Sequence, residues 1–339
     1  MKTKTLMVQL LAALSAFSLP GLTAHGAEPE KFNGHIDRYD AAFDHLIAPD
    51  AKIEFLAQGF TWAEGPVWMG DSLLFSDVPQ NTAYRWKPGQ TKAEVFLQPS
   101  GLLTPNPAFR EPGSNGLARD AQGRLLLCQH GERRVARYAD GKFTALADHF
   151  DGKRFNSPND LALRTNGDIY FTDPPYGLDG GDKSPLKELP YHGIYRVATD
   201  GKVTLLNDRI RFPNGIGFSP DERTLYIGST DNTAPMIYAF DVLADGTLAN
   251  QRVFFDPAPL RKPDAPGSCD GLKVDREGNV WSSGPGGILV LSPAGKLLGR
   301  LNTGVSTANC GWGDDGGTLY ITANHFLLRI RTLVKGTGQ

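Results

Sequence analysis

Short apolar runs, each preceded by a polar turn, recur along the chain after residue 60. Six of them are GDSLLFSD, DAQGRLLLCQHG, RTNGDIYFTD, SPDERTLYIGSTD, DREGNVWSSG and DDGGTLYITANH. The runs have almost no helical periodicity, and Gly and Pro are abundant between them, a pattern typical of β-strands joined by turns. A short helix is expected within residues 38–57, before the first strand. We therefore predict an all-β fold.

The first apolar residue after each polar turn marks a repeat. The markers are Leu73, Leu125, Ile169, Leu225, Val280 and Leu319, and they are separated by 39 to 56 residues. A repeat of this length with several strands is typical of propeller blades. Two separate β-domains or a sandwich are the alternatives, but neither predicts the same hairpin along the whole chain. We predict one six-bladed β-propeller over residues 28–339.

A side chain with an oxygen atom stands 9 to 11 residues before every marker. These residues are Glu64, Asn115, Asn159, Asn214, Asp270 and Asn309. Asn or Asp at a single such position is often only a turn former, whereas Glu64 is not a turn former. Rotation about the central axis relates the blades, so residues at the same distance before their markers have equivalent positions, which we call equal phase. We therefore predict that these groups converge at one mouth of the central channel.

The predicted cluster contains carboxylate and amide oxygens and neither Cys nor His. Such a set suits a hard divalent cation. If Glu64 and Asp270 were buried together without a cation, their repulsion would raise the pKa of one carboxyl group. We expect one divalent cation at the channel mouth, with Ca²⁺ as the first choice and Mg²⁺, Mn²⁺ and Zn²⁺ as alternatives.

Three further segments are expected on the same face. An antiparallel return of the strand LLLCQHG brings His130 there, either beside a substrate or as an ordinary polar residue at a strand end. Two long inserts, residues 99–113 and 173–193, leave the same face. Inserts of this length are often lids or binding loops, and the alternative is that they only cover the face.

Several segments resemble one known family. AEGPVW, RFNSPNDLAL, FTDPPYG, FPNGIGFSPDERTLY and CDGLKVDREGNVW are similar to the senescence marker protein/gluconolactonase family. The resemblance spans about residues 50–330 and is closest to exported bacterial members. It implies a six-bladed propeller that hydrolyses lactones or related esters with one divalent cation.

The resemblance also implies roles for individual residues. Glu64, Asn159, Asn214 and Asp270 would bind the metal, and Asp270 would also act as the general base. Asn115, Arg154 and His130 would line the substrate pocket. Some family members have a shorter RFND where this chain has RFNSPND. Of the two Asn residues in this segment, the repeat phase selects Asn159 rather than Asn156 as the metal ligand.

The resulting hypothesis is metal-assisted hydrolysis of a sugar lactone, a small-molecule substrate. The metal would polarise the carbonyl while Asp270 takes a proton from water. The sequence contains no G-x-S-x-G motif, which argues against an α/β-hydrolase mechanism. Two alternatives stay open: another lactone, ester or phosphotriester at the same site, and a non-catalytic binding propeller tied together by its ion.

The N-terminus and the charge indicate where the protein works. Residues 1–27 have the basic start, the apolar stretch and the small-residue end of a signal peptide. We therefore expect a periplasmic or secreted protein without a membrane anchor after cleavage. The net charge is −2, and Lys and Arg form no basic stripe for nucleic acid. Whether Cys269 and Cys310 form a disulfide is open.

Overall fold

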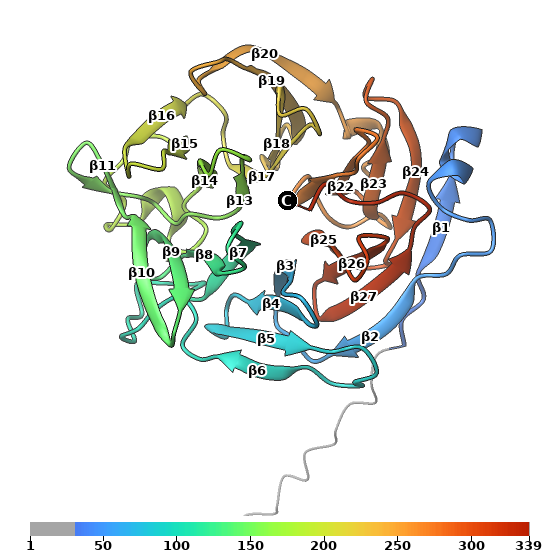
Figure 1. The fold of residues 1–339 in the computed structure, drawn as a ribbon, viewed down its shortest axis with the longest axis horizontal. Helices are drawn as coiled ribbons and strands as arrows, with labels where there is room; N and C mark the ends of the chain where they lie inside the picture. The colour runs from blue at the N-terminus through green and yellow to red at the C-terminus, as the bar shows by residue number, and fades with distance from the viewer. Residues whose placement is uncertain (1–30, 339) are drawn as a thin grey trace, which may run out of the picture. The chain divides into compact units, whose positions relative to one another are not determined.

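Six antiparallel sheets stand around a common centre (Figure 1). The computed structural model describes residues 31–338, so the expected signal peptide at 1–27 lies outside the described residues. The chain from Phe32 onward forms one compact unit. The predicted all-β, six-bladed propeller is confirmed.

Each sheet is one blade, and its strands follow one another from the centre of the ring outward. The first blade contains β3 (Ala63–Trp68), β4 (Leu73–Asp77), β5 (Thr82–Trp86) and β6 (Glu94–Leu97). The second contains β7 (Ser114–Arg119), β8 (Leu125–Gln129), β9 (Arg134–Ala139) and β10 (Lys142–Ala147). The third contains β13 (Leu161–Leu163), β14 (Ile169–Asp173), β15 (Gly193–Val197) and β16 (Val203–Asn207).

Of the remaining three blades, the fifth and sixth also include a strand from the start of the described chain. The fourth contains β17 (Pro213–Phe218), β18 (Thr224–Ser229), β19 (Met236–Val242) and β20 (Leu248–Phe255). The fifth contains β21 (Leu272–Val274), β22 (Val280–Gly284), β23 (Gly287–Leu291), β24 (Leu297–Asn302) and β1 (His35–Arg38). The sixth contains β25 (Asn309–Gly313), β26 (Thr318–Ala323), β27 (Phe326–Arg331) and β2 (Glu54–Gln58).

Three short helices and a small hairpin complete the unit. They are the 3₁₀ helices η1 (Ala41–His45), η2 (Gly181–Lys183) and η3 (Ala258–Leu260), and the strands β11 (His149–Phe150) and β12 (Lys153–Arg154). The short helix expected within residues 38–57 is therefore confirmed as η1. Asp40 caps this helix by accepting a hydrogen bond from the Ala42 N–H.

The first strands of the chain close the ring. β2 pairs antiparallel with β27, which places Glu54 opposite Arg329. Because β2 is followed in the chain by β3 of the first blade, this pairing ties the sixth blade to the first. Phe43 of η1 is fully buried in the cluster that packs the fifth blade against the sixth. Burying a Phe side chain contributes about 1.5–3 kcal/mol.

The hydrophobic core lies between the faces of neighbouring blades. Every residue of β4 and of β14 is buried, because both faces of a second strand pack against other blades. β20, an outermost strand, has no fully buried residue. This difference explains why the apolar runs that start at or next to the predicted markers read as continuous rather than alternating.

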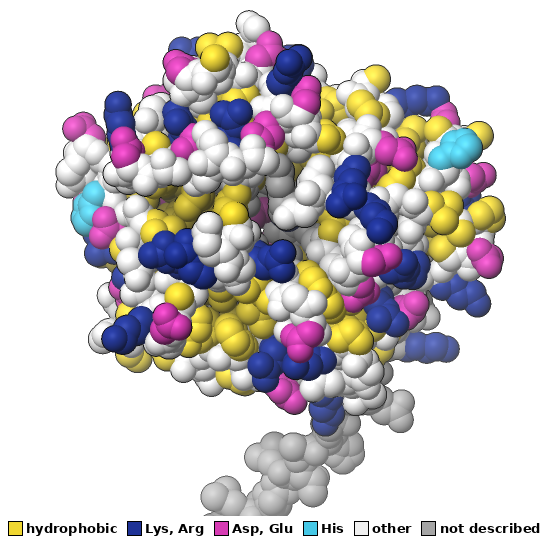
Figure 2. Space-filling view, in the orientation of Figure 1, with side chains coloured by type: hydrophobic (Ala, Val, Ile, Leu, Met, Phe, Trp, Pro, Cys, Tyr) yellow, Lys and Arg dark blue, Asp and Glu magenta, His cyan; other side chains and the backbone are white. Residues whose placement is uncertain are grey.

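Three remaining properties bear on the other predictions. Cys128, Cys269 and Cys310 are all buried and free, so Cys269 and Cys310 form no disulfide. No helix among residues 31–338 is long and apolar enough to cross a membrane. On the face shown in Figure 2, Lys and Arg side chains are interspersed with Asp and Glu side chains.

Candidate metal and active site

The innermost strands bring the predicted oxygen-bearing residues to one end of the channel. Glu64, Asn115 and Asn214 lie near the start of β3, β7 and β17, and Asn159 and Asp270 lie two residues before β13 and β21. They share a cavity of about 150 Å³. Its lining consists of Trp62, Glu64, Glu111, Asn115, Asn159, Tyr176, Asn214, Thr230 and Asp270. Five of the six residues that stand at the predicted distance before their markers therefore line one cavity.

Irregular strand pairing turns these side chains inward. The register shifts between Glu64 and Val67 in β3, and the same shift occurs after Ser114 in β7 and after Pro213 in β17. A bulge of this kind bends a strand and re-aims its side chains. The repeated sequence words thus encode a repeated bulge at the channel mouth.

Glycine follows several site residues because neighbouring blades approach closely there. A Cβ atom on Gly65, which has a φ of +53°, would lie 2.2 Å from the Asn115 carbonyl oxygen. A Cβ atom on Gly215 would lie 2.2 Å from the Asp270 carbonyl oxygen, which accepts the Gly215 N–H at 2.9 Å. These contacts hold the innermost strands together around the site.

Glu64 is a buried carboxylate with one oxygen already held. Its side chain is 1% exposed, and Oε2 accepts hydrogen bonds from the Gly65 N–H at 2.7 Å and from Asn309 Nδ2 at 3.1 Å. Burial and the nearby Asp160 carboxylate raise the pKa of Glu64 to about 8. Oε1 accepts no hydrogen bond from the described residues and is available to a cation.

Two amides present oxygens to the same cavity. Asn159 Oδ1 is buried and has no hydrogen-bond partner among the described residues. Asn214 donates from Nδ2 to Thr230 Oγ1 at 2.9 Å, and Thr230 in turn donates to the Cys269 carbonyl at 2.9 Å. These two hydrogen bonds fix the Asn214 side chain through its Nδ2. The amide oxygen is therefore left to face the cavity. An unpaired buried acceptor is costly, and a bound cation would satisfy it.

Asp270 completes the set and creates a conflict of charge. Its backbone N–H donates to Ser283 Oγ at 2.8 Å, which fixes the residue ahead of β21. Burial raises the pKa of Asp270 well above its usual value, and the Glu64 carboxylate raises it further. The two carboxylates cannot both be charged at neutral pH without a compensating positive charge.

A divalent cation fits this donor set. The four candidate ligands are all hard oxygen donors, and the cation would relieve both the charge conflict and the unpaired Asn159 oxygen. No cluster of three or more His, Cys, Asp or Glu side chains suited to a metal occurs within residues 31–338. The candidate site therefore depends on its two amides, and the identity of the ion stays a prediction.

Asn309 has the predicted phase but serves a different purpose. Its Nδ2 donates to Glu64 Oε2 and, at 3.3 Å, to Asp160 Oδ2, and its Oδ1 accepts the Cys310 N–H. Asp160 Oδ2 also lies 3.7 Å from Lys273 Nζ. Asn309 thus fixes the Glu64 carboxylate by a hydrogen bond and links it to the buried ion pair of Asp160 and Lys273.

The three residues expected to line the substrate pocket have different positions. Asn115 lines the cavity, and its buried Oδ1 has no hydrogen-bond partner among the described residues. His130 is fully buried outside the lining, and its Nδ1 lies 3.9 Å from Glu111 Oε2. Arg154 also lies outside the lining, where its guanidinium donates to the Glu132 carbonyl. The substrate-binding roles of all three stay predictions.

The two long inserts dock on each other and each supplies one side chain to the cavity. The Arg110 N–H donates to the Gly177 carbonyl at 3.0 Å, and the Asp179 N–H donates to the Ala108 carbonyl at 2.9 Å. Glu111 comes from the first insert and Tyr176 from the second. Length marks these loops in the sequence, but nothing in an irregular sequence indicates which side chain turns inward.

Trp62 and Thr230 also line the cavity, although the sequence reasoning does not select them. Trp62 comes two residues before Glu64, and Thr230 directly follows β18. Both positions adjoin strand ends that the repeat places at this mouth. The repeat phase could therefore have marked their neighbourhood, although not their orientation.

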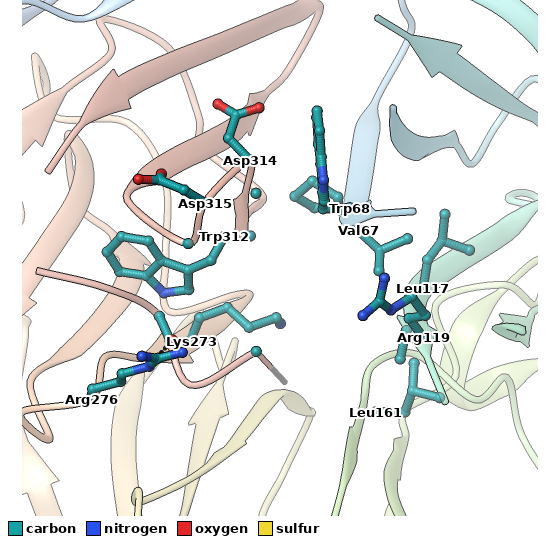
Figure 3. Close-up of a pocket in the computed structure, with 17 residues that line it drawn as sticks. Val67, Trp68, Leu117, Arg119, Leu161, Lys273, Arg276, Trp312, Asp314 and Asp315 are labelled. Carbon is teal, nitrogen blue, oxygen red and sulfur yellow. Dashed lines mark hydrogen bonds between the residues drawn. The ribbon is translucent and has the colours of Figure 1, made fainter. Parts of the chain in front are cut away.

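The opposite ends of the innermost strands surround a second hollow (Figure 3). It has a volume of about 290 Å³. Among the residues around it are Trp68, Arg119, Lys273, Arg276, Trp312, Asp314 and Asp315. Lys273 belongs to the same buried network as Glu64, so this network extends between the two mouths.

Most of the chain matches known proteins. Residues 62–325 match the model of the SMP-30/Gluconolactonase/LRE-like region. A gluconolactonase of Zymomonas mobilis is 34% identical over 356 aligned residues, which cover 99% of this chain and 98% of that protein. A pentonolactonase of Haloferax volcanii is 28% identical, with coverage of 76% and 80%.

Solved structures agree with the fold. The structure of a gluconolactonase from Xanthomonas campestris superposes with a TM-score of 0.76 and is 34% identical in sequence. The match covers 90% of this chain and 96% of that one. The sequence and structural comparisons therefore point to the same group of proteins.

Proposed function

Because this chain belongs to the SMP-30/Gluconolactonase/LRE-like family, we propose that it is a hydrolase that opens a sugar lactone to its aldonic acid. One observation carries the proposal: Glu64, Asn159, Asn214 and Asp270 meet in a single cavity. The likeness to gluconolactonases and a pentonolactonase supports the class of substrate.

The residues of the cavity suit this reaction. Glu64, Asn159, Asn214 and Asp270 would hold one divalent cation, with Ca²⁺ first and Mg²⁺, Mn²⁺ or Zn²⁺ as alternatives. The bound cation would act as a Lewis acid on the lactone carbonyl and stabilise the negative charge that develops on its oxygen. Asp270 would take a proton from the attacking water, and Asn115 would contact the substrate.

The burial of the site supports this assignment of the base. The Asp270 side chain lines the cavity, so its carboxylate can reach a water molecule there. The Asp270 backbone N–H donates to Ser283 Oγ at 2.8 Å, which fixes the residue beside the cavity. Docked inserts above the cavity would limit the access of bulk water.

The test is hydrolysis of glucono-δ-lactone by the purified mature protein, followed by proton release. The protein is first treated with a chelator, and Ca²⁺, Mg²⁺, Mn²⁺ or Zn²⁺ is then added separately, with spontaneous opening subtracted. We expect metal-dependent turnover that Glu64→Gln abolishes. Metal binding at a 1:1 ratio without turnover would contradict the proposal and favour another ester, a phosphotriester or a binding role.

We also propose that the protein is exported. The signal-like sequence of residues 1–27 supports this. Expression of the full chain followed by cell fractionation and mass spectrometry of the mature N-terminus tests it. An uncleaved chain found only in the cytoplasm would contradict export.

A further inference from the structure

The cavity contains a third carboxylate, which does not come from a blade. Glu111 lies in the first insert and faces the same cavity as Glu64 and Asp270. The second insert supports its backbone, since the Gly177 carbonyl accepts N–H groups from Arg110 and Glu111. The docked inserts therefore present Glu111 to whatever occupies the cavity.

The Glu111 carboxylate has no hydrogen-bond donor among the described residues. Its nearest positively charged group is Arg110, whose Nε lies 3.6 Å from Oε1. The other neighbour is His130, whose Nδ1 lies 3.9 Å from Oε2. Burial lowers the pKa of His130 to about 3, so His130 is neutral. The Glu111 side chain is 26% exposed, and its oxygens can accept hydrogen bonds from a ligand in the cavity.

A shared metal ion does not account for Glu111. Glu64, Asp270 and Glu111 do not form a three-carboxylate cluster suited to one ion, since no such cluster exists within residues 31–338. Glu111 is still close enough for its charge to raise the pKa of Asp270. It therefore lies beside the candidate metal position, where a substrate would extend away from its reacting carbonyl.

Tyr176 of the second insert adds a hydroxyl group to the same wall. Its buried Oη lies near Thr230 but forms no well-aligned hydrogen bond with any described residue. Its ring stacks on Phe212, with centroids 5.9 Å apart and an interplanar angle of 19°. This packing restricts the ring, so Oη is held in place for a ligand.

The chemistry of this wall suits a ring that carries hydroxyl groups. A carboxylate accepts hydrogen bonds from hydroxyls, and Tyr176 Oη can donate or accept. Trp62 adds an aromatic surface that can pack on the C–H face of a sugar. Other charged groups of the second insert are engaged elsewhere: Asp182 contacts His192 at 2.6 Å, and Glu188 contacts Arg133 at 3.2 Å.

We propose that Glu111 and Tyr176 determine specificity by binding ring hydroxyl groups of the lactone, so that the enzyme prefers a polyhydroxylated lactone to an unsubstituted one. This inference rests on the proposed lactone hydrolysis. A site built to form hydrogen bonds discriminates strongly against an analogue that lacks the bonding group, because its own polar atoms then stay unpaired.

The test compares two lactones with the same ring size, glucono-δ-lactone and δ-valerolactone. The kcat/KM value of each is measured by proton release for the wild type, Glu111→Gln and Tyr176→Phe. Gln keeps the size of Glu but removes its charge, and Phe removes only the hydroxyl. We expect Glu111→Gln to lower the preference for glucono-δ-lactone about 10- to 100-fold, because a neutral amide that can also donate replaces a charged acceptor.

Tyr176→Phe is expected to lower the same preference about 10-fold, because a neutral hydrogen bond contributes less. In Tyr176→Phe the value for δ-valerolactone is expected to stay near that of the wild type, and in Glu111→Gln it is expected to change less than the value for glucono-δ-lactone. Asp179→Asn is the matched control, since Asp179 lies in the second insert but is exposed and outside the cavity lining. It is expected to leave both values unchanged.

Each outcome decides between the two proposals. If the wild type opens neither lactone, the proposed function is wrong and the inference falls with it. If it opens lactones but Glu111→Gln and Tyr176→Phe lower both kcat/KM values equally, or neither, only the inference is overturned. Thermal melts of each variant with bound metal distinguish a loss of recognition from a loss of folding.

Discussion

The two mouths of the channel lie at opposite ends of the innermost strands, yet their polar groups differ in one respect. At the cavity with Glu64 and Asp270, carboxylates face each other and the Asn159 oxygen has no partner among the described residues. At the other mouth the charges are largely matched. Asp315 pairs with Arg331 at 3.0 Å, and Arg276 donates to the Gly336 carbonyl at 3.2 Å.

Volume alone does not single out the candidate site. The hollow in Figure 3 has about 290 Å³, compared with about 150 Å³ for the candidate site. A buried acceptor or charge without a partner is unfavourable in the absence of a ligand. Unmatched polar groups, rather than volume, are therefore the reason for assigning the candidate site to this mouth.

The buried network explains how matched and unmatched charges coexist. Lys273, which lines the opposite hollow, pairs with Asp160, and Asn309 links Asp160 to Glu64. Lys273 thus supplies one positive charge to Asp160 and Glu64 at the centre of the channel. It does not neutralise Asp270, which is left for a cation to compensate.

The sharpest contrast between the mouths is expected in turnover. Asp270→Asn should lower kcat for lactone opening by about 10²- to 10⁴-fold, because the amide cannot accept a proton from water. Asp314→Asn, at the opposite mouth, should leave kcat unchanged, since Asn can still accept the Tyr320 hydroxyl that bonds Asp314 at 3.1 Å. Proton release measures both.

Metal content and melting temperature are determined for the same samples. A folded Asp270→Asn variant that binds the metal and turns over at the wild-type rate would show that Asp270 is not the base. An equal loss of kcat in Asp314→Asn would remove the distinction between the mouths.

At the opposite mouth, where the charges are largely matched, the largest effect of a substitution is expected on stability. Lys273 is 8% exposed and Asp160 is 1% exposed, so Lys273→Met leaves a buried carboxylate without its cation. We expect the free energy of unfolding to fall by about 3–5 kcal/mol, measured by chemical denaturation at pH 7.

The double variant Lys273→Met/Asp160→Asn is the matched control. It removes both charges and keeps an oxygen that can accept the Leu161 N–H now bonded by Asp160 at 2.9 Å. It should recover most of the lost stability, because an uncharged pair carries no desolvation penalty of this size. If the single and double variants are equally unstable, packing rather than charge is responsible.

At the mouth with Glu64 and Asp270, where the carboxylates lack a compensating charge, the stability of the protein should depend on both metal and pH. In the metal-free protein the pKa of Glu64 is raised from 4.5 to about 8, so the folded state binds a proton more tightly than the unfolded state. This contribution to stability is fully present below pH 4.5 and is lost as pH rises through about 8. Asp270 shifts in the same direction.

Chelated protein should therefore melt at a lower temperature at pH 8 than at pH 5. A cation present at 100 times its Kd should add about 2.7 kcal/mol and reduce this loss with pH, because it takes the place of the protons. Melting curves at both pH values, with chelator and with Ca²⁺, test this. A chelated protein whose stability rises between pH 5 and pH 8 would contradict the charge conflict, and Glu64→Gln should show a weaker dependence.

The repeated parts of the molecule could be predicted from the sequence. The repeat places Glu64, Asn159, Asn214 and Asp270 together because rotation about the axis maps one blade onto the next, so equal phase means equal position. Asn309 shows the limit of this reasoning. Its phase is the same, but its amide is bonded to Glu64, Asp160 and Cys310, and phase alone does not determine hydrogen bonding.

The irregular parts could not be predicted at the level of residues. The length of the inserts at residues 99–113 and 173–193 indicates that they cover the site. Only their docking, for example through the hydrogen bond between Arg110 and Gly177, turns Glu111 and Tyr176 inward. Strand direction predicts that His130 reaches this face, and the structure places it fully buried, with Nδ1 3.9 Å from Glu111 Oε2 and outside the cavity lining. Strand direction specifies the face that a residue reaches, and packing determines its depth.

The smallest effect is expected for Arg119, whose side chain makes no hydrogen bond or ion pair with the described residues although it lines the opposite hollow. Because Arg119 is exposed, water solvates its charge, unlike that of the buried acids. Arg119→Gln should change the free energy of unfolding by no more than about 0.5 kcal/mol and leave kcat/KM for lactones unchanged. Denaturation and proton release on one preparation measure both. A fall in kcat/KM at constant stability would show that an anion at the opposite mouth contributes to activity, and an unmatched charge would then indicate function even where it is exposed.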